Sequence, residues 1–297
     1  MTCRRERLFA PTSWALIISG AILLIVGAAG CSSQRLQTVA ISAEGNGFVD
    51  AHSQEPFVPF GTNYYDPNTG WPPHIWQQFD QERIEKHFYT LTRVGANCAR
   101  VFLTAATFQP DANTVDEQAL AKLDTLIDIA GRAKIRLIVT GPTDWEGQVP
   151  YWQEDQYAGD EAIEALELLW TVLGQRYQGD SAILAWDLAN EPALPWSLPS
   201  WNQKWNAYLE SKYVNREGLE EAWGSVLADD EPWGHIDMPD DVADQGNPRL
   251  YDWQLFRESL ADRWVQRQVE ALRAADPTHL VTIGYTQWSY PVARPGI

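Results

Sequence analysis

The residues best suited to chemistry stand where short apolar segments of the sequence end. Asn190, Glu191 and Pro192 directly follow the apolar residues 183–188. The other polar or aromatic side chains at such ends are Asn63, Tyr64, Arg100, Asp144, Trp145, Tyr285, Gln287 and Trp288. Cleavage of a glycosidic bond needs a carboxylic acid and a second carboxylate. Aromatic rings can stack on sugar rings, and amides can bond the hydroxyls. These residue types favour glycoside cleavage, with Glu191 as the central carboxylate.

Other chemistries find little support in the sequence. The 5 histidines are not spaced as a metal-binding pair, and no grouping favours a serine–histidine–aspartate triad. No Gly-x-Gly-x-x-Gly or phosphate-binding loop follows a strand, which disfavours nucleotide binding. The net charge of −18 would repel nucleic acid, and its simplest interpretation is solubility. We predict no metal, no cofactor and no nucleic-acid partner.

Apolar and amphipathic segments alternate along the chain. Strands are expected at residues 57–65, 96–103, 135–140, 183–188 and 280–285, and helices at 80–94, 116–133, 160–177 and 252–274. This alternation predicts an α/β fold with a parallel sheet covered by helices. Spacing alone leaves both a doubly wound sheet and a barrel open. An acidic, tryptophan-rich insertion is expected over residues 193–250.

The tryptophan content is high, with 15 in the chain. Stacking on sugar rings would explain it, and so would burial in a core. Trp170 and Trp264 fall within predicted amphipathic helices, so we expect both in the core.

The first thirty residues do not resemble a folded domain. Arginines near the amino terminus precede an apolar segment over residues 14–26, and Cys31 follows a run of small residues. This plan resembles a bacterial lipoprotein signal, with a signal peptide over 1–30, lipid on Cys31 and a polar tether over 31–42. The alternative is an uncleaved membrane anchor. Both predict that the folded part, 43–297, is exported across the bacterial cytoplasmic membrane and held at the cell envelope.

Three strand motifs resemble those of barrel glycoside hydrolases. They are Phe-Gly-Thr-Asn-Tyr-Tyr at 60–65, Gly-Ala-Asn-Cys-Ala-Arg-Val-Phe at 95–102 and Trp-Asp-Leu-Ala-Asn-Glu-Pro at 186–192. They are similar to the first, second and fourth strands of family five, the cellulases and endo-β-mannanases. Residues 205–224 resemble an insertion of family forty-two β-galactosidases. The resemblance spans about residues 43–290 and implies a TIM (β/α)8-type barrel.

The resemblance implies a role for each matching residue. Glu191 would be the general acid/base of a retaining mechanism, Asn190 would bond the sugar 2-hydroxyl, and Arg100 would keep the nucleophilic carboxylate ionised. A structural ion pair is the alternative for Arg100. The expected substrate-binding residues are Asn63, Tyr64, Trp145, Tyr285 and Trp288. The expected substrate of this monomer is a β-linked polysaccharide or oligosaccharide, with mannan, β-glucan and β-galactoside all open.

The chain departs from the family pattern in its strand number. The family places its nucleophilic glutamate at the end of the seventh strand, and only five strands are recognised here. We therefore expect an incomplete barrel with about five of eight βα units, no nucleophile in the chain and little or no hydrolysis. A non-catalytic surface glycan-binding lipoprotein is the alternative function. A gene fragment that does not fold is the third interpretation.

Overall fold

The computed structural model describes residues 36–70, 72–143, 149–152, 155–240 and 247–285. These residues belong to one compact unit. The predicted signal over 1–30, the lipidation residue Cys31 and the binding residues Trp145 and Trp288 lie outside them. Among the described helices, none combines the length and the apolar character that crossing a membrane requires.

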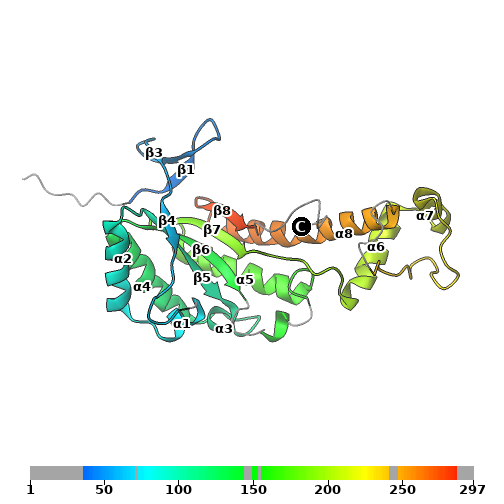
Figure 1. The fold of residues 1–297 in the computed structure, drawn as a ribbon, viewed down its shortest axis with the longest axis horizontal. Helices are drawn as coiled ribbons and strands as arrows, with labels where there is room; N and C mark the ends of the chain where they lie inside the picture. Colours follow the sequence, from blue (N-terminus) through cyan, green and yellow to red (C-terminus); the bar gives the residue numbers. More distant parts are fainter. Residues whose placement is uncertain (1–35, 71, 144–148, 153–154, 241–246, 286–297) are drawn as a thin grey trace, which may run out of the picture. The chain divides into compact units, whose positions relative to one another are not determined.

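Five parallel strands form the main sheet (Figure 1). They are β4 (Gly61–Asn63), β5 (Cys98–Thr104), β6 (Arg136–Thr143), β7 (Ile183–Asn190) and β8 (Leu280–Gly284). Each strand pairs with the next one along the chain, so the spatial order is β4-β5-β6-β7-β8. A doubly wound sheet would reverse its order at a switch point, and these strands never do. The sequence left the two folds open, and the strand order decides for a barrel-type sheet.

Helices cover one face of this sheet. The main ones are α2 (Gln81–Arg93), α4 (Glu117–Ala133), α5 (Asp160–Tyr177) and α8 (Pro248–Ala275), with the short α1 (Pro72–Gln77) and α3 (Ala105–Phe108). Side chains of Asp80, Asp116 and Asn247 each accept a backbone N–H in the first turn of a main helix. α2 packs on α4, and α5 packs on α8 (Figure 1). The four predicted long helices are confirmed.

The expected first strand over 57–65 is wrong in its extent. The structure divides it into β3 (Pro56–Phe57) and β4, which lie in different sheets. Pro59 stands between them and has no backbone N–H to give to a strand ladder. β3 instead continues the antiparallel sheet of β1 (Val39–Ile41) and β2 (Phe48–Asp50).

The small sheet also corrects the expected tether over 31–42. β1 lies within that range, and Val39 packs with Cys98 and Leu184 in a small apolar cluster. The guanidinium of Arg136, at the start of β6, donates to the carbonyl of Gln37 at 2.7 Å. The buried side chain of Val39, the hydrogen bond to Gln37 and the pairing of β1 make residues 37–41 part of the domain. The small sheet thus packs at the amino ends of the main strands.

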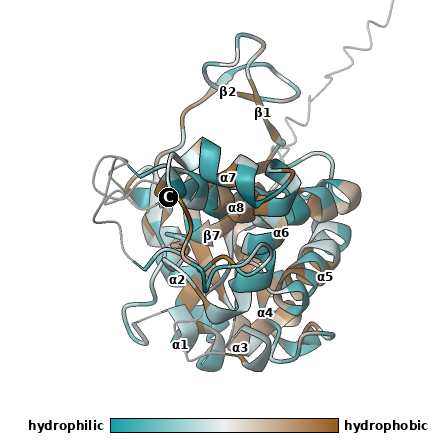
Figure 2. Cartoon of the chain, turned by 90° about the vertical axis from the view of Figure 1, so that its right-hand side faces the viewer, coloured by the Kyte–Doolittle hydropathy of each residue, from teal (hydrophilic) through white to brown (hydrophobic). Residues whose placement is uncertain are grey.

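Most tryptophans are explained by burial. Trp170 and Trp264, expected in the core, are both buried there. The insertion forms η2 (Pro199–Trp201), α6 (Asn202–Lys212) and α7 (Arg216–Trp223), and α8 begins before the insertion was expected to end. Together with the start of α8, these helices bury a second apolar cluster around Trp201, Trp205 and Trp253. β7 is largely hydrophobic along its length, whereas α7 is largely hydrophilic (Figure 2).

Candidate active site

Arg100, the third residue of β5, joins that strand to the carboxyl half of β7. Its Nε donates to Oδ2 of Asp187 at 2.9 Å, and its Nη2 bonds the same carboxylate oxygen. Its Nη1 donates to Oδ1 of Asn190 at 2.8 Å. Thr140 on β6 donates its hydroxyl to Oδ2 of Asp187 at 2.8 Å. One guanidinium therefore fixes two side chains of β7, with β6 supplying a third contact.

Asp187 is the partner that the sequence did not reveal. It is 1% exposed, and the side chains of Arg100 and Thr140 both bond its Oδ2. Burial raises the pKa of Asp187, while the charge and hydrogen bonds of Arg100, the hydroxyl of Thr140 and the backbone N–H of Gly284 act to lower it. Arg100 thus forms an ion pair with Asp187, and its expected role toward a nucleophilic carboxylate stays a prediction.

Asn190 is oriented by the same arginine. A guanidinium can only donate hydrogen bonds, so the amide must turn its oxygen toward Arg100. Its Nδ2 group is then left to donate elsewhere. That geometry suits the predicted bond from Asn190 to a sugar hydroxyl.

Glu191 occupies a backbone conformation that is unusual for its residue type. Its φ is +51°, in the left-handed region, where a residue with a Cβ costs about 1–2 kcal/mol. Its backbone N–H donates to the carbonyl of Gly284 on β8 at 2.6 Å. The register between β7 and β8 shifts just before this point, between Asp187 and Asn190. Strained backbone held by a neighbouring strand is common at functional sites. Here it holds the exposed carboxylate of Glu191 at the end of the sheet.

Gly284 permits this arrangement because it has no side chain. A Cβ there would lie 2.6 Å from Nη2 of Arg100 and 3.1 Å from the carbonyl oxygen of Ala189. The 2.6 Å contact is shorter than real Cβ atoms make, so the guanidinium would have to move, and the 3.1 Å contact is also tight. The end of β8 therefore supports both Arg100 and Glu191.

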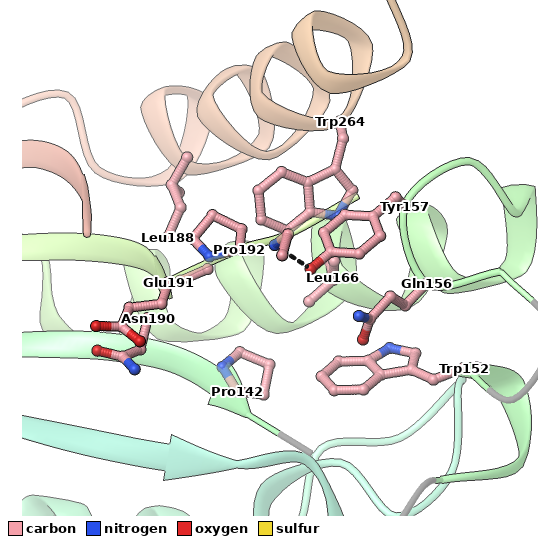
Figure 3. A pocket seen from close by; sticks show the side chains of 12 residues that line it. Pro142, Trp152, Gln156, Tyr157, Leu166, Leu188, Asn190, Glu191, Pro192 and Trp264 are labelled. Carbon is pink, nitrogen blue, oxygen red and sulfur yellow. Dashed lines mark hydrogen bonds between the residues drawn. The ribbon is translucent and has the colours of Figure 1, made fainter. Parts of the chain in front are cut away.

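A pocket opens beside Glu191 (Figure 3). Its volume is about 310 Å³, and Asn190 and Glu191 lie at one end of it. The other lining residues are Pro142, Trp152, Gln156, Tyr157, Leu166, Leu188, Ala189, Pro192, Ala193 and Trp264. The pocket thus has a polar end and an aromatic end. Such a pocket suits a ligand with hydroxyl groups for the polar end and a ring face for the aromatic end.

The predicted substrate-binding residues do not all reach this site. Tyr64 is a correction: its ring is buried against Phe88, and its hydroxyl bonds Nδ1 of His87 at 2.9 Å, so it serves the core. Asn63 is exposed at the end of β4, and Tyr285 is exposed just after β8. Both stay predictions.

The described side chains do not form a metal site. No group of three histidine, cysteine, aspartate or glutamate residues within the described ranges is arranged to hold a metal ion.

Comparison with known families decides the classification. The family model described as cellulase, glycosyl hydrolase family 5, matches residues 50–214, which is more than half of the chain. The chain belongs to glycosyl hydrolase family 5. A second family model, described as β-galactosidase of family 42, matches residues 161–293. The family 5 match covers Arg100, Asn190 and Glu191.

The individual relatives of this family 5 chain include a β-galactosidase and a mannan endo-1,4-beta-mannosidase. A β-galactosidase of Thermus thermophilus is 22% identical over 252 residues, covering 75% of this chain and 37% of that protein. Mannan endo-1,4-beta-mannosidase 8 of Oryza sativa subsp. japonica is 26% identical over 192 residues, covering 54% of this chain and 50% of that protein. The chain thus spans between about a third and a half of the length of these relatives.

Solved structures support the fold of the family 5 chain. The β-galactosidase of Marinomonas ef1 has a TM-score of 0.60 at 21% identity, covering 78% of this chain and 38% of that chain. The β-galactosidase of Rahnella sp. R3 has a TM-score of 0.62 at 15% identity, covering 86% and 38%. These are TIM-barrel glycoside hydrolases, so the expectation of a TIM-type barrel, present here with five parallel strands in the described residues, is confirmed.

Proposed function

We propose that the chain carries the acid/base half of a retaining glycoside hydrolase that acts on β-linked polysaccharide or oligosaccharide. The observation that supports this most is Glu191 held by β8 at the end of β7, beside an oriented amide and an aromatic pocket. In such a mechanism Glu191 protonates the leaving glycosidic oxygen and later removes a proton from the attacking water. Asn190 donates to the 2-hydroxyl of the sugar being cleaved.

The mechanism also needs a second carboxylate as nucleophile. Asp187 does not serve, because it is buried and bonded to Arg100 and Thr140. No other aspartate or glutamate is found at the end of a main-sheet strand within the described ranges. We therefore propose weak or no hydrolysis by the 297-residue chain, with sugar binding retained.

The proposed substrate class is β-mannan and its oligosaccharides. Relatives from rice and Aspergillus species are named mannan endo-1,4-beta-mannosidases. β-Galactosides come second, because the Thermus thermophilus relative is named a β-galactosidase.

In a form of the protein that supplies the second carboxylate, Glu191→Gln tests the acid/base role. The amide cannot give up a proton, so cleavage of mannan, whose leaving group is poor, should fall to the background rate while mannobiose still binds. Glu258→Gln, an exposed change on α8, is the matched control and should leave hydrolysis unchanged. Reducing-end release and titration calorimetry measure the two properties. Mannan cleavage that survived in Glu191→Gln would refute the assignment, and binding of no β-linked sugar would refute the function.

A second function has one observation in its favour. The described residues offer no free second carboxylate at the strand ends, which also suits a non-catalytic glycan-binding lipoprotein. Sugar binding with no hydrolysis under any condition would favour this alternative. Glycan binding alone does not require the Arg100–Asn190–Glu191 arrangement, which is why we place it second.

The proposed location is the bacterial cell envelope, with lipid on Cys31. The support is the sequence pattern of arginines, apolar residues and Cys31. Cys31→Ser should abolish incorporation of labelled fatty acid and release the protein from the membrane fraction. Unchanged labelling would refute lipidation at this residue.

A further inference from the structure

We propose that the outer surface of α2 and α4 docks on the anionic headgroups of the membrane that holds the protein. We call it the basic surface, and it consists of Lys86, Tyr89, Arg93, Val94, Arg132 and Lys134. The inference rests on the proposed envelope location, since it assumes that lipid on Cys31 holds the chain at a membrane.

One exposed face of α2 carries side chains suited to a membrane surface. Lys86, Tyr89 and Arg93 follow one another at spacings of three and four residues, so they share a face of the helix. The ring of Tyr89 is 66% exposed, and Val94, just after the helix, is 64% exposed. Tyrosine is enriched at membrane–water interfaces because its ring is apolar and its hydroxyl is polar. This face therefore offers the mixed chemistry that a headgroup layer requires.

A groove between α2 and α4, which lie side by side, gives the basic surface an apolar floor (Figure 1). Its volume is about 430 Å³; Tyr89 and Thr92 line it from α2, Ile129 and Ala133 line it from α4, and Lys134 also lines it. The hydroxyl of Thr92 donates to the carbonyl of Ala133 at 3.1 Å and ties the two helix ends together. An apolar groove lined in part by basic side chains suits a phospholipid, whose phosphate bonds the cations while its carbon chain contacts the floor.

The local charge of this surface is opposite to that of the whole chain. The basic side chains here are Lys86, Arg93, Arg132 and Lys134, and the neighbouring acids are Glu85 and Asp128. Only one of these cations, Arg132, forms a salt bridge to a described residue, and its partner is Glu85 at 2.6 Å. The net charge of −18 does not cancel this local excess, because at physiological salt charges beyond about 8 Å are largely screened. The surface therefore attracts an anionic layer that contacts it directly.

Compensation of the helix dipole explains only part of this pattern. Each of the four long helices has a basic residue in its last turn, which would account for Arg93 and Arg132. Lys86 lies seven residues before the end of α2, so the dipole does not explain it. The dipole also does not explain an exposed tyrosine ring between two cations.

The basic surface lies where the chain enters the domain. β5 begins five residues after α2 ends, and β6 begins three residues after α4 ends, so both helix ends lie at the amino ends of the strands. Arg136, two residues after Lys134, donates to the carbonyl of Gln37 at 2.7 Å. Six residue steps separate Cys31 from Gln37, and they span at most about 22 Å. Docking here leaves the candidate active site, at the carboxyl ends, facing away from the membrane.

A fluorescent probe on either side of the domain tests this orientation. Thr90→Cys on the basic surface and Val226→Cys in the insertion, which is 86% exposed, would each carry nitrobenzoxadiazole. Cys98 is buried and lipid would block the thiol of Cys31, so the introduced cysteine takes the label. The lipidated protein is reconstituted in phosphatidylglycerol vesicles that contain a spin-labelled lipid. The spin label should quench the probe at position 90 about threefold or more than the probe at position 226, because a docked surface reaches the headgroup layer.

A charge reversal tests the electrostatic part of the inference. Arg93→Glu should lower the ratio of docked to undocked protein about fivefold or more, measured as lost quenching at position 90. Lys204→Glu makes the same charge change on α6 and is the matched control, which should leave the quenching unchanged. Thermal melting checks that both variants fold. Salt at 1 M, where the Debye length falls to about 3 Å, should also remove most of the quenching.

Fatty-acid labelling of the same protein separates this inference from the location on which it rests. If Cys31 carries no lipid, the proposed location fails and the docking fails with it. If Cys31 is lipidated and both probes are quenched equally, the location stands and the docking is wrong. Equal quenching at position 90 on phosphatidylcholine and phosphatidylglycerol vesicles, or equal losses in the two charge variants, would overturn the role of the basic side chains.

Discussion

Replacing Asp187 by asparagine tests how strongly the ion pair with Arg100 organises the strand ends. The side chain of Asp187 is 1% exposed and that of Arg100 is 19% exposed. Removing one partner of a buried pair costs about 3–5 kcal/mol, because the remaining charge loses its compensation. In Asp187→Asn the remaining charge is a partly hydrated guanidinium that keeps its bond to Asn190. We therefore expect a loss of about 2–3 kcal/mol in the free energy of unfolding, below the range for full burial.

Arg100→Met should cost more than Asp187→Asn. It leaves the carboxylate of Asp187 buried, with the hydroxyl of Thr140 as its remaining side-chain donor among the described residues. The expected loss in the free energy of unfolding is about 3–5 kcal/mol. Protonation of Asp187 would remove its buried charge and so make this loss smaller. The double variant should lose less than the sum of the two single losses by about 1 kcal/mol or more, since the two groups are in contact.

Urea unfolding followed by tryptophan fluorescence measures these losses. A loss of about 3 kcal/mol should also lower the melting temperature by roughly 6–12 °C in a domain of about this size. Mannobiose affinity should fall in Asp187→Asn as well, because the amide of Asn190 depends on a fixed Arg100. If Asp187→Asn shifts the free energy of unfolding by less than about 0.5 kcal/mol, or the two single losses add, the reasoning is wrong.

Three further changes test other parts of the structure. Gly284→Ala should lower the free energy of unfolding by about 1–3 kcal/mol and weaken sugar binding, because the added Cβ would collide with Arg100. An unchanged melting temperature would contradict the close contact between Gly284 and Arg100. Burial raises the pKa of Asp276, but its hydrogen bonds lower that pKa by more, from 3.8 to about 2. Asp276 therefore contributes stability above pH 4, and this contribution is lost as the pH falls toward 2. Asp276→Asn should remove that part of the acid dependence, measured as urea stability against pH. Asp252→Ala would leave the indole N–H of Trp223 unpaired in the insertion and should cost about 3 kcal/mol, read by urea unfolding.

The sequence was sufficient to locate the ends of strands and the helices between them. Periodicity showed where α4 and α5 lie to within a residue, because each has a continuous apolar face and a clear start. Asn190 and Glu191 could be proposed because they stand at the end of an apolar strand, whereas Arg100 lies inside β5. Local pattern is enough when a residue's role depends on its own element.

The sequence was not sufficient where partners come from distant segments. Asp187 stands inside an apolar strand, and its partner Arg100 is 87 residues away. Its signal was present as a lone acid in an otherwise apolar run, which a buried strand does not tolerate unpaired. Tyr64 failed for the opposite reason: it follows a strand end, but its ring turns into the core toward His87. Which face a residue takes depends on packing that no single segment specifies.

The contacts that fix the acid/base half of the site come from four neighbouring strands. β5 supplies Arg100, β6 supplies Thr140, β7 supplies Asp187 and Asn190, and β8 supplies the carbonyl that holds Glu191. Each of these four strands pairs with the next one along the chain. This half of the site can therefore be organised by β5 to β8 alone, whatever supplies the nucleophile. Under the proposed function, sugar binding depends on this half and hydrolysis needs both halves, so sugar binding is the sharper first test of the described residues.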